Sequence, residues 1–299
     1  MSQVSVRDVL FGWGAPTEVT VKNRIIRFIE LQRPVINVIG FFPLVMAAAA
    51  LAGGRLDDPR FPFGLIMVYL LVASNLVVND RVDAERDKRK WPLRPLATGL
   101  ISNTEATLYI FTLAGLSFAI ALVVFNWLSA AITFFIFILA YIYARYTRDN
   151  VGYLTVLVPG ALIPLAVWAA ISPETILTPV PWLLVALRGV YGMAINTANE
   201  ATDKVPVKPL FVQVRPFTEK VVYAAAVIVS LFIGILLIFY AQVSWLYLVV
   251  LVVATAYALI AAKSVGSQRF PEAVGKNIMI FTLSNAISLL GLAVFAWIR

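Results

Sequence analysis

The chain has 299 residues, of which 61% are hydrophobic and only 13% are charged, and its mean hydropathy is +0.88. Because soluble domains carry about 25% charged residues, this composition excludes an ordinary soluble protein and indicates that lipid surrounds most of the chain. The sequence contains no cysteine and no histidine. This excludes disulfides, thiolate nucleophiles, histidine bases and histidine-based zinc sites, so any bound metal would be a hard cation with oxygen ligands.

The N-terminal residues 1–32 are polar and mixed in charge, without the short apolar core and small-residue cleavage site of a secretory signal. We therefore expect a cytoplasmic segment that lies at the membrane interface. Within it, Ile25 and Ile29 stand among the basic residues Arg24 and Arg27. A helix over residues 21–30 would thus lie flat on an anionic surface.

Nine hydrophobic stretches follow, each long enough for a helix to cross about 30 Å of hydrocarbon. They fall at residues 34–53, 62–80, 104–125, 127–145, 152–172, 180–201, 217–239, 243–262 and 277–298. The sequence therefore predicts an all-α polytopic membrane protein. Residues 33–299 are expected to form one domain, a bundle of nine transmembrane helices around a central polar pocket, with membrane lipid as its surroundings.

Basic residues are distributed unequally between the two ends of these spans. Twenty of the 24 lysines and arginines fall in the N-terminal segment and in the loops after the second, fourth, sixth and eighth spans, whereas three fall on the other side and Arg188 lies within a span. Cytoplasmic loops are rich in Lys and Arg, so we expect a cytoplasmic N-terminus and an external C-terminus. The net charge of +8 then reflects membrane orientation, and no nucleic-acid partner is expected.

The end of the second span carries four polar residues at a spacing of four, namely Asn75, Asn79, Asp83 and Asp87. Residues four apart share one helix face, and such a stripe near the bilayer is costly unless it faces a wet cavity or a cation. Amide and carboxylate oxygens suit Mg²⁺, which bridges to phosphate oxygens. The basic residues of segment 88–94 could pair with a diphosphate, although basic residues at this place also fit ordinary membrane anchoring.

The end of the sixth span carries a second polar face, formed by Asn196, Asn199 and Asp203. Arg188 lies about three turns before Asn199 and is expected on the same side. An arginine inside a span needs a partner. This partner is either a diphosphate or carboxylate ligand in the pocket, or an acidic side chain on another helix, and both alternatives stay open.

The pattern NDxxDxxxD that begins at Asn79, followed by PxRPxxxG from Pro92, resembles the signature of the UbiA superfamily of intramembrane prenyltransferases. The number of spans and their orientation are also similar. The resemblance implies an enzyme that uses Mg²⁺ to transfer a prenyl group from an isoprenyl diphosphate to an aromatic, quinone-precursor or lipid acceptor. It also implies an active site on the cytoplasmic side of the membrane.

The chain departs from this family in its second motif, which is normally DxxxD, often with a further Asp three residues earlier. Asn196 and Asn199 take the places of the first two acids, and Asp203 keeps the last. An amide oxygen can ligate a metal but adds no negative charge, so a second Mg²⁺ would be held more weakly. The family often has a tyrosine and a lysine after the fourth span, where this chain has Tyr143 and Arg148; Arg148 equally fits a charge that sets membrane orientation.

The motifs and the resemblance together predict a site with a diphosphate between the ends of the second and sixth spans. The expected catalytic residues are Asp83, Asp87 and Asp203, and the expected metal ligands are these three with Asn79 and Asn199. The expected substrate-binding residues are Asn75, Arg94, Tyr143, Arg148, Arg188 and Lys204.

Aromatic side chains either shield a carbocation in the pocket or pack in the core and against lipid; the candidates are Tyr109, Phe111, Tyr141, Trp168, Tyr191 and Phe281. A UbiA-type terpene cyclase, which needs no acceptor, is an alternative that the altered second motif keeps open. A secondary transporter is disfavoured, because its acids would lie near the middle of the membrane. The acceptor, the prenyl chain length and the oligomeric state stay open.

Overall fold

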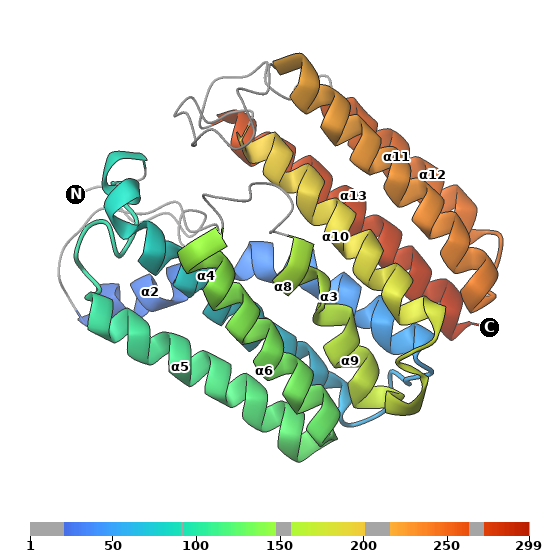
Figure 1. Ribbon diagram of the computed structural model, residues 1–299, viewed down its shortest axis with the longest axis horizontal. Helices are drawn as coiled ribbons and strands as arrows, with labels where there is room; N and C mark the ends of the chain where they lie inside the picture. The colour runs from blue at the N-terminus through green and yellow to red at the C-terminus, as the bar shows by residue number, and fades with distance from the viewer. Residues whose placement is uncertain (1–20, 91, 148–156, 201–215, 263–271, 299) are drawn as a thin grey trace.

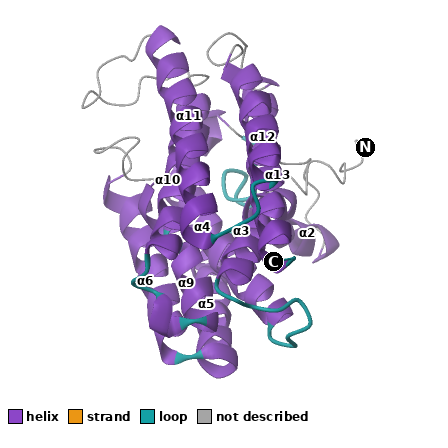
Figure 2. Cartoon of the chain, turned by 90° about the vertical axis from the view of Figure 1, so that its right-hand side faces the viewer, coloured by secondary structure: helices purple, strands orange, loops and turns teal. Residues whose placement is uncertain are grey.

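The computed structural model describes residues 21–90, 92–147, 157–200, 216–262 and 272–298. Every regular element in these residues is a helix and none is a strand (Figures 1 and 2). The prediction of an all-α polytopic protein is therefore confirmed.

The described chain forms a series of long helices with three short helical turns. The long helices of the first half are α2 (Val21–Leu31), α3 (Pro34–Leu51), α4 (Phe61–Lys90), α5 (Asn103–Ile120) and α6 (Trp127–Ile142). The second half has the short helices α8 (Leu157–Ala161) and α9 (Ile163–Ile171) and then the long helices α10 (Pro179–Glu200), α11 (Pro216–Ala241), α12 (Tyr247–Ala262) and α13 (Glu272–Trp297). The π-helical turns η1 (Ala121–Phe125) and η2 (Tyr143–Thr147) continue α5 and α6, and the 3₁₀ turn η4 (Pro173–Thr175) follows α9.

Each of the nine predicted spans has a helical counterpart. Five segments are long and apolar enough to cross a membrane, namely Arg24–Leu51, Phe61–Lys88, Asn103–Phe125, Trp127–Tyr146 and Val221–Ala241. The remaining four counterparts are shorter apolar helices, namely Pro159–Ile171, Pro179–Ile195, Tyr247–Ile260 and Thr282–Trp297. The expected count of nine is roughly consistent with the described part of the chain.

Two predicted spans have different limits in the structure. The second hydrophobic span was placed at residues 62–80, and α4 continues beyond it to Lys90, so that Asp83 and Asp87 lie on the same helix as expected. The fifth span was expected to be one helix over 152–172, but its described part is divided at Leu162 into α8 and α9. Pro164 stands in the first turn of α9, where a missing N–H is tolerated, whereas a helix running straight through would lose a hydrogen bond there.

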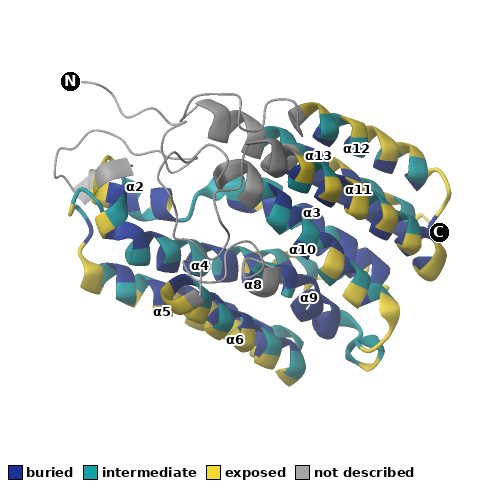
Figure 3. Cartoon of the chain, turned by 45° about the horizontal axis from the view of Figure 1, so that its top comes forward, coloured by how far each residue is buried: buried dark blue, intermediate teal, exposed yellow. Residues whose placement is uncertain are grey.

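The bundle is apolar both inside and outside. α3 packs against α13, α4 and α9. Its alanines Ala47–Ala50 are buried, and such small side chains let neighbouring helices approach closely in a membrane. The outer faces of α5, α6, α11 and α12 expose large apolar side chains, among them Phe111, Phe134 and Phe232 (Figure 3). These faces are suited to contact lipid.

Helix α2 forms where the sequence predicts it, but its charged residues are not all on the outside. Arg27 and Glu30 are 2% and 0% exposed and form an ion pair of 2.7 Å. Ile25 and Ile29, one turn apart, are exposed instead. The described surface of α2 therefore combines these apolar side chains with the exposed Arg24.

Candidate active site at the end of α4

The last turns of α4 carry three buried carboxylates. Asp80, Asp83 and Asp87 are 4%, 8% and 3% exposed, and their spacing of three and four residues keeps them on one helix face. We refer to these three residues as the acidic cluster. A helix of 30 residues is about 45 Å long, which exceeds the 30 Å of hydrocarbon in a typical bilayer, and the cluster lies in the last, charged turns of α4.

Each carboxylate of the acidic cluster accepts a hydrogen bond from an arginine. Arg94 Nη1 donates to Asp87 Oδ2 at 2.7 Å and approaches Asp80 Oδ1 at 3.4 Å. Arg86 donates to Asp83 at 3.0 Å, and Arg33, just before α3, donates to Asp80. The negative charge of the cluster is thus balanced within the protein.

The loop that carries Arg94 is held by the elements around it. Arg27 Nη1 of α2 lies 3.4 Å from the carbonyl oxygen of Leu93. Gly99 then turns the chain with a φ of 74°, a conformation that glycine adopts without steric cost. Ser102 starts α5 as part of a capping box with Glu105, which satisfies free N–H groups of the first turn.

Arg94 keeps its charge in this position. Burial by itself would lower the pKa of its guanidinium, but the nearby carboxylates of Asp80, Asp87 and Asp83 act in the opposite direction and the pKa is raised. A permanently charged arginine suits the binding of phosphate oxygens.

Two amide oxygens beside the acidic cluster have no hydrogen-bond partner. The side-chain oxygens of Asn75 and Asn79, which precede the cluster on α4, are buried and unsatisfied among the described residues. Buried polar atoms are normally hydrogen-bonded, so an unsatisfied oxygen is a candidate ligand atom. Among the described residues, acidic side chains alone do not form a group of three that could hold a metal ion. Amide and carboxylate oxygens together are, however, the donor set that Mg²⁺ takes. The residues present therefore fit this ion.

The second predicted motif lies largely outside the described residues. α10 extends to Glu200, so the backbone of Asn196 and Asn199 is helical, but their side chains are not described. Asp203, Lys204 and Arg148 are outside the described residues altogether. Their roles stay predictions.

Tyr143 and Arg188 both lie in described helices. Tyr143 begins η2, which contacts α4. The guanidinium of Arg188 lies over the ring of Phe41, with Cζ 4.4 Å from the ring centroid. No acidic side chain of the described residues pairs with Arg188, so the alternative of an acidic partner on another helix finds no support in this part of the chain.

The aromatic candidates are dispersed. Phe111 and Tyr141 are exposed on the outer surface, and Trp168 is buried with its indole N–H donating to Thr175 at 2.8 Å. Tyr109 contacts Gln32 at the α2–α3 junction, Tyr191 is buried in α10, and the side chain of Phe281 is not described. These positions favour packing over cation shielding for Phe111, Tyr141 and Trp168.

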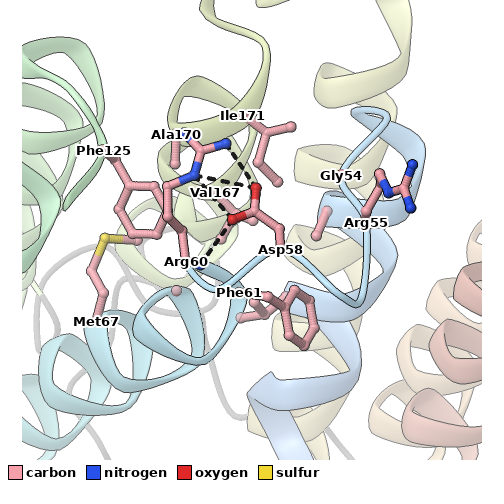
Figure 4. A pocket seen from close by; sticks show the side chains of 13 residues that line it. Gly54, Arg55, Asp58, Arg60, Phe61, Met67, Phe125, Val167, Ala170 and Ile171 are labelled. Atoms are coloured by element: carbon pink, nitrogen blue, oxygen red, sulfur yellow. Dashed lines mark hydrogen bonds and ion pairs between the residues drawn. The ribbon is translucent and has the colours of Figure 1, made fainter.

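A separate recess lies at the other end of α4. It has a volume of about 430 Å³, partly open to solvent, and its wall includes Phe61, Phe125 and Ile171. Arg60 and Asp58 form an ion pair of 2.7 Å at its edge (Figure 4). None of the predicted site residues lines it, and Phe61 is 22 residues from Asp83, about 33 Å along a helix.

The model of the UbiA prenyltransferase family matches residues 41–296 of the chain. Among curated proteins, the chain is similar to 4-hydroxybenzoate octaprenyltransferases of Vibrio cholerae, with 29% identity over 184 residues, and of Shewanella halifaxensis, with 30% identity over 185 residues. The alignment covers 60% of this chain in both cases, and 63% and 62% of the relatives, which is less than two thirds of their length.

Solved structures with the same fold cover nearly the whole chain. A structure reported for digeranylgeranylglyceryl phosphate synthase has a TM-score of 0.66 at 17% identity and covers 93% of this chain and all of its own. A UbiA homologue from Archaeoglobus fulgidus, bound to GPP and Mg²⁺, has a TM-score of 0.64 at 18% identity and covers 91% of this chain and 100% of its own. At these identities the likeness concerns the fold. Together with the family match, it shows that the chain belongs to the UbiA prenyltransferase family.

Proposed function

We propose that the protein transfers a prenyl group from an isoprenyl diphosphate to an acceptor within the membrane. The observation that carries this proposal is the acidic cluster at the end of α4. Its three buried carboxylates are paired with arginines, and two unsatisfied amide oxygens lie beside it on the same helix. Support comes from the family match, from relatives named 4-hydroxybenzoate octaprenyltransferase, and from a structural neighbour bound to GPP and Mg²⁺.

We assign the metal ligands to the ends of the second and sixth predicted spans. Asn79, Asp83 and Asp87 would hold Mg²⁺ from α4, and Asn199 and Asp203 would contribute from the sixth span. When bound, Mg²⁺ would neutralise charge on the diphosphate and make it a better leaving group. The asparagine in the second motif weakens that half, because it supplies an oxygen without negative charge.

The arginines would bind the remaining diphosphate oxygens. Arg94 already lies 2.7 Å from Asp87, and a guanidinium has five N–H donors in a planar fork, so it can contact a carboxylate and a phosphate oxygen together. Arg148 and Lys204 would add positive charge from the neighbouring loops, while Asn75 and Tyr143 would orient the substrate. These groups stabilise the negative charge that develops as the bond breaks.

In the reaction, the bond between the allylic carbon and the diphosphate oxygen breaks and its electron pair stays with the diphosphate. The acceptor atom then forms a bond to that carbon and loses a proton. Since the chain has no histidine, the proton goes to a carboxylate, a tyrosine or the diphosphate. Exclusion of water by the apolar bundle would protect the carbon from hydrolysis. We place this site on the cytoplasmic side, in line with the distribution of basic residues.

The test is turnover by the purified full chain in liposomes with Mg²⁺, geranylgeranyl diphosphate and a panel of acceptors that includes 4-hydroxybenzoate. Asp83→Asn and Asp87→Asn should each lower the rate about 100-fold or more, because each removes a negatively charged oxygen ligand that would hold Mg²⁺ against the diphosphate. The matched control is Glu85→Gln, on the same turn of α4 but with a side chain that is 84% exposed, which should keep wild-type activity.

Full activity in both aspartate variants would overturn the assignment. Mass spectrometry of products formed from the prenyl diphosphate alone distinguishes the alternative chemistry. A cyclic hydrocarbon or alcohol made without acceptor would identify a cyclase in place of a transferase.

A further inference from the structure

Asp80 belongs to the acidic cluster but differs from Asp83 and Asp87 in its surroundings. Its carboxylate is contacted by two guanidinium groups through the same oxygen, Oδ1. One belongs to Arg33, just before α3, and the other to Arg94, in the loop after α4. An oxygen that already faces two positive charges is a poor ligand for a third cation, because like charges repel. Asp80 is therefore distinct from the residues that we assign to Mg²⁺.

The helix geometry brings Asp80 and Asp87 to one shared guanidinium group. The two residues are seven positions apart, which is two turns or about 10.5 Å along a helix, and they project in nearly the same direction. Arg94 Nη1 contacts both, at 2.7 Å from Asp87 Oδ2 and 3.4 Å from Asp80 Oδ1. Two carboxylates fix the orientation of a guanidinium group more closely than one. Asp80 therefore restricts the direction in which Arg94 presents its other N–H groups.

The other arginine on Asp80 extends from a junction that neighbouring helices hold in place. Arg33 lies between α2 and α3, directly after Gln32. The side chain of Gln32 accepts a hydrogen bond from Tyr69 Oη of α4 at 2.6 Å and donates one to Tyr109 Oη of α5. The backbone next to Arg33 is thus attached to both α4 and α5. Arg33 therefore reaches Asp80 from a fixed position and holds its carboxylate from the side opposite the loop.

The charge of Asp80 also determines how Arg94 and Asp87 can be used. Asp80 is 4% exposed, so little water is present to screen the charges around it. Without its negative charge, the guanidinium groups of Arg33 and Arg94 would face each other at close range and repel. Arg94 would then bind Asp87 more strongly, in competition with the metal that Asp87 is proposed to hold. With Asp80 charged, Asp87 can serve Mg²⁺ while Arg94 stays in position.

From these contacts we infer that Asp80 is a positioning residue, which holds Arg94 in the orientation that binds the diphosphate and does not itself ligate Mg²⁺. This inference rests on the proposed function and divides the acidic cluster into two tasks. Asp83 and Asp87 serve the metal, whereas Asp80 serves the diphosphate through Arg94. Arg33 supplies the opposite charge that a buried carboxylate needs when it is not bound to a metal.

The deciding experiment measures metal binding and diphosphate binding separately in the purified full chain. Binding of Mn²⁺ alone is followed by electron paramagnetic resonance, and binding of radiolabelled geranylgeranyl diphosphate is followed in the presence of Mg²⁺. Asp80→Asn should weaken diphosphate binding about 10-fold, as expected for a weakened charged hydrogen bond, and should change the affinity for Mn²⁺ by less than about 3-fold. Asp87→Asn should instead weaken Mn²⁺ binding about 10-fold or more, because it removes a charged ligand.

A double variant tests whether Asp80 acts through Arg94. Arg94→Gln alone should weaken diphosphate binding about 10- to 100-fold, and the addition of Asp80→Asn should weaken it no further, because coupled residues are not additive. Asp80→Glu keeps the charge and can be measured even if Asp80→Asn does not fold; it should bind diphosphate within about 3-fold of the wild type. The matched control is Asp57→Asn, an exposed carboxylate just before α4 that also pairs with an arginine, and it should change neither affinity.

Three results would overturn the inference. A loss of Mn²⁺ affinity in Asp80→Asn as large as in Asp87→Asn would make Asp80 a metal ligand. Additive losses in the double variant would show that Asp80 does not act through Arg94. A lowered Tm in Asp80→Asn with both affinities retained would leave Asp80 a structural role alone. Failure of the proposed function is seen separately, as a chain that gives the expected binding results but forms no prenylated product with any acceptor.

Discussion

Arg33 binds Asp80 of the acidic cluster and has an unusual backbone conformation. Its φ of 47° and ψ of 62° lie in the left-handed region, which residues other than glycine rarely adopt. Pro34 follows directly and begins α3. In this conformation the chain turns from α2 into α3 while the guanidinium of Arg33 donates to Asp80. Strain of this kind persists where the surrounding contacts fix it, and it is found at functional sites.

Replacing Arg33 by Gly and by Ala separates the backbone effect from the loss of charge. Both variants lose the pair with Asp80, so both should lower the affinity for the prenyl diphosphate. Arg33→Gly removes the cost of the left-handed conformation, so it should be more stable than Arg33→Ala by about 1 kcal/mol. Thermal unfolding of the two purified variants checks this, and an alanine variant as stable as the glycine variant would contradict it.

Some of these residues were predictable from local spacing and others were not. Asp83 and Asp87 were selected because four-residue spacing places them on one helix face, and Arg94 because a recognisable motif follows that helix. The contact between Arg33 and Asp80 joins residues 47 positions apart and depends on the backbone angles of Arg33. Neither periodicity nor composition carries that information. The side-chain oxygens of Asn37 and Asn285 are buried without a hydrogen-bond partner among the described residues, and this was not predicted because single polar residues in apolar spans have no spacing pattern.

At the scale of elements, hydropathy predicted the helices well and their limits poorly. The second span was assigned to residue 80, where charged residues begin, yet α4 continues to Lys90 because its acids are neutralised by Arg33, Arg86 and Arg94. It ends two residues before Pro92, which disfavours helical conformation in the residue before it. Hydropathy reports the lipid-facing part of a helix, whereas the helix itself continues as long as its backbone and charges are satisfied.

The contact between α12 and α13 offers a test of packing. A Cβ atom at Gly291 would lie 2.6 Å from Val250 Cγ1 and 3.2 Å from Val250 Cβ, and a β-branched side chain has little freedom to move away. We expect Gly291→Ala to destabilise the protein by about 1–3 kcal/mol. The matched control is Gly115→Ala in α5, where a Cβ would meet nothing within 4 Å.

Because alanine favours the helix over glycine by about 0.5–1 kcal/mol, Gly115→Ala should be neutral or stabilising. Thermal unfolding of both variants in the same detergent provides the comparison. Equal stability of the two variants would show that α12 and α13 are not closely packed at Gly291.

For the whole molecule, orientation in the membrane is the main remaining prediction. The sequence has no cysteine, so a single introduced cysteine can be labelled without background. Asp57 lies just before α4 and Glu85 lies in its last turns, and their side chains are 70% and 84% exposed. With a cytoplasmic N-terminus, Asp57→Cys should react with a membrane-impermeant maleimide in intact cells. Glu85→Cys should react only after the cells are permeabilised, and the reverse pattern would contradict the predicted orientation.

The 30-residue length of α4 has a consequence for the fate of the products. With the charged last turns of α4 at the membrane interface, the acidic cluster would lie near the water and the apolar part of the bundle would lie in the hydrocarbon. A prenyl transfer at that boundary would release diphosphate into the aqueous phase and leave the prenylated product dissolved in the bilayer. The two products would thereby be diluted into different phases as they form, so their recombination would be disfavoured by mass action and the reaction would be driven in one direction.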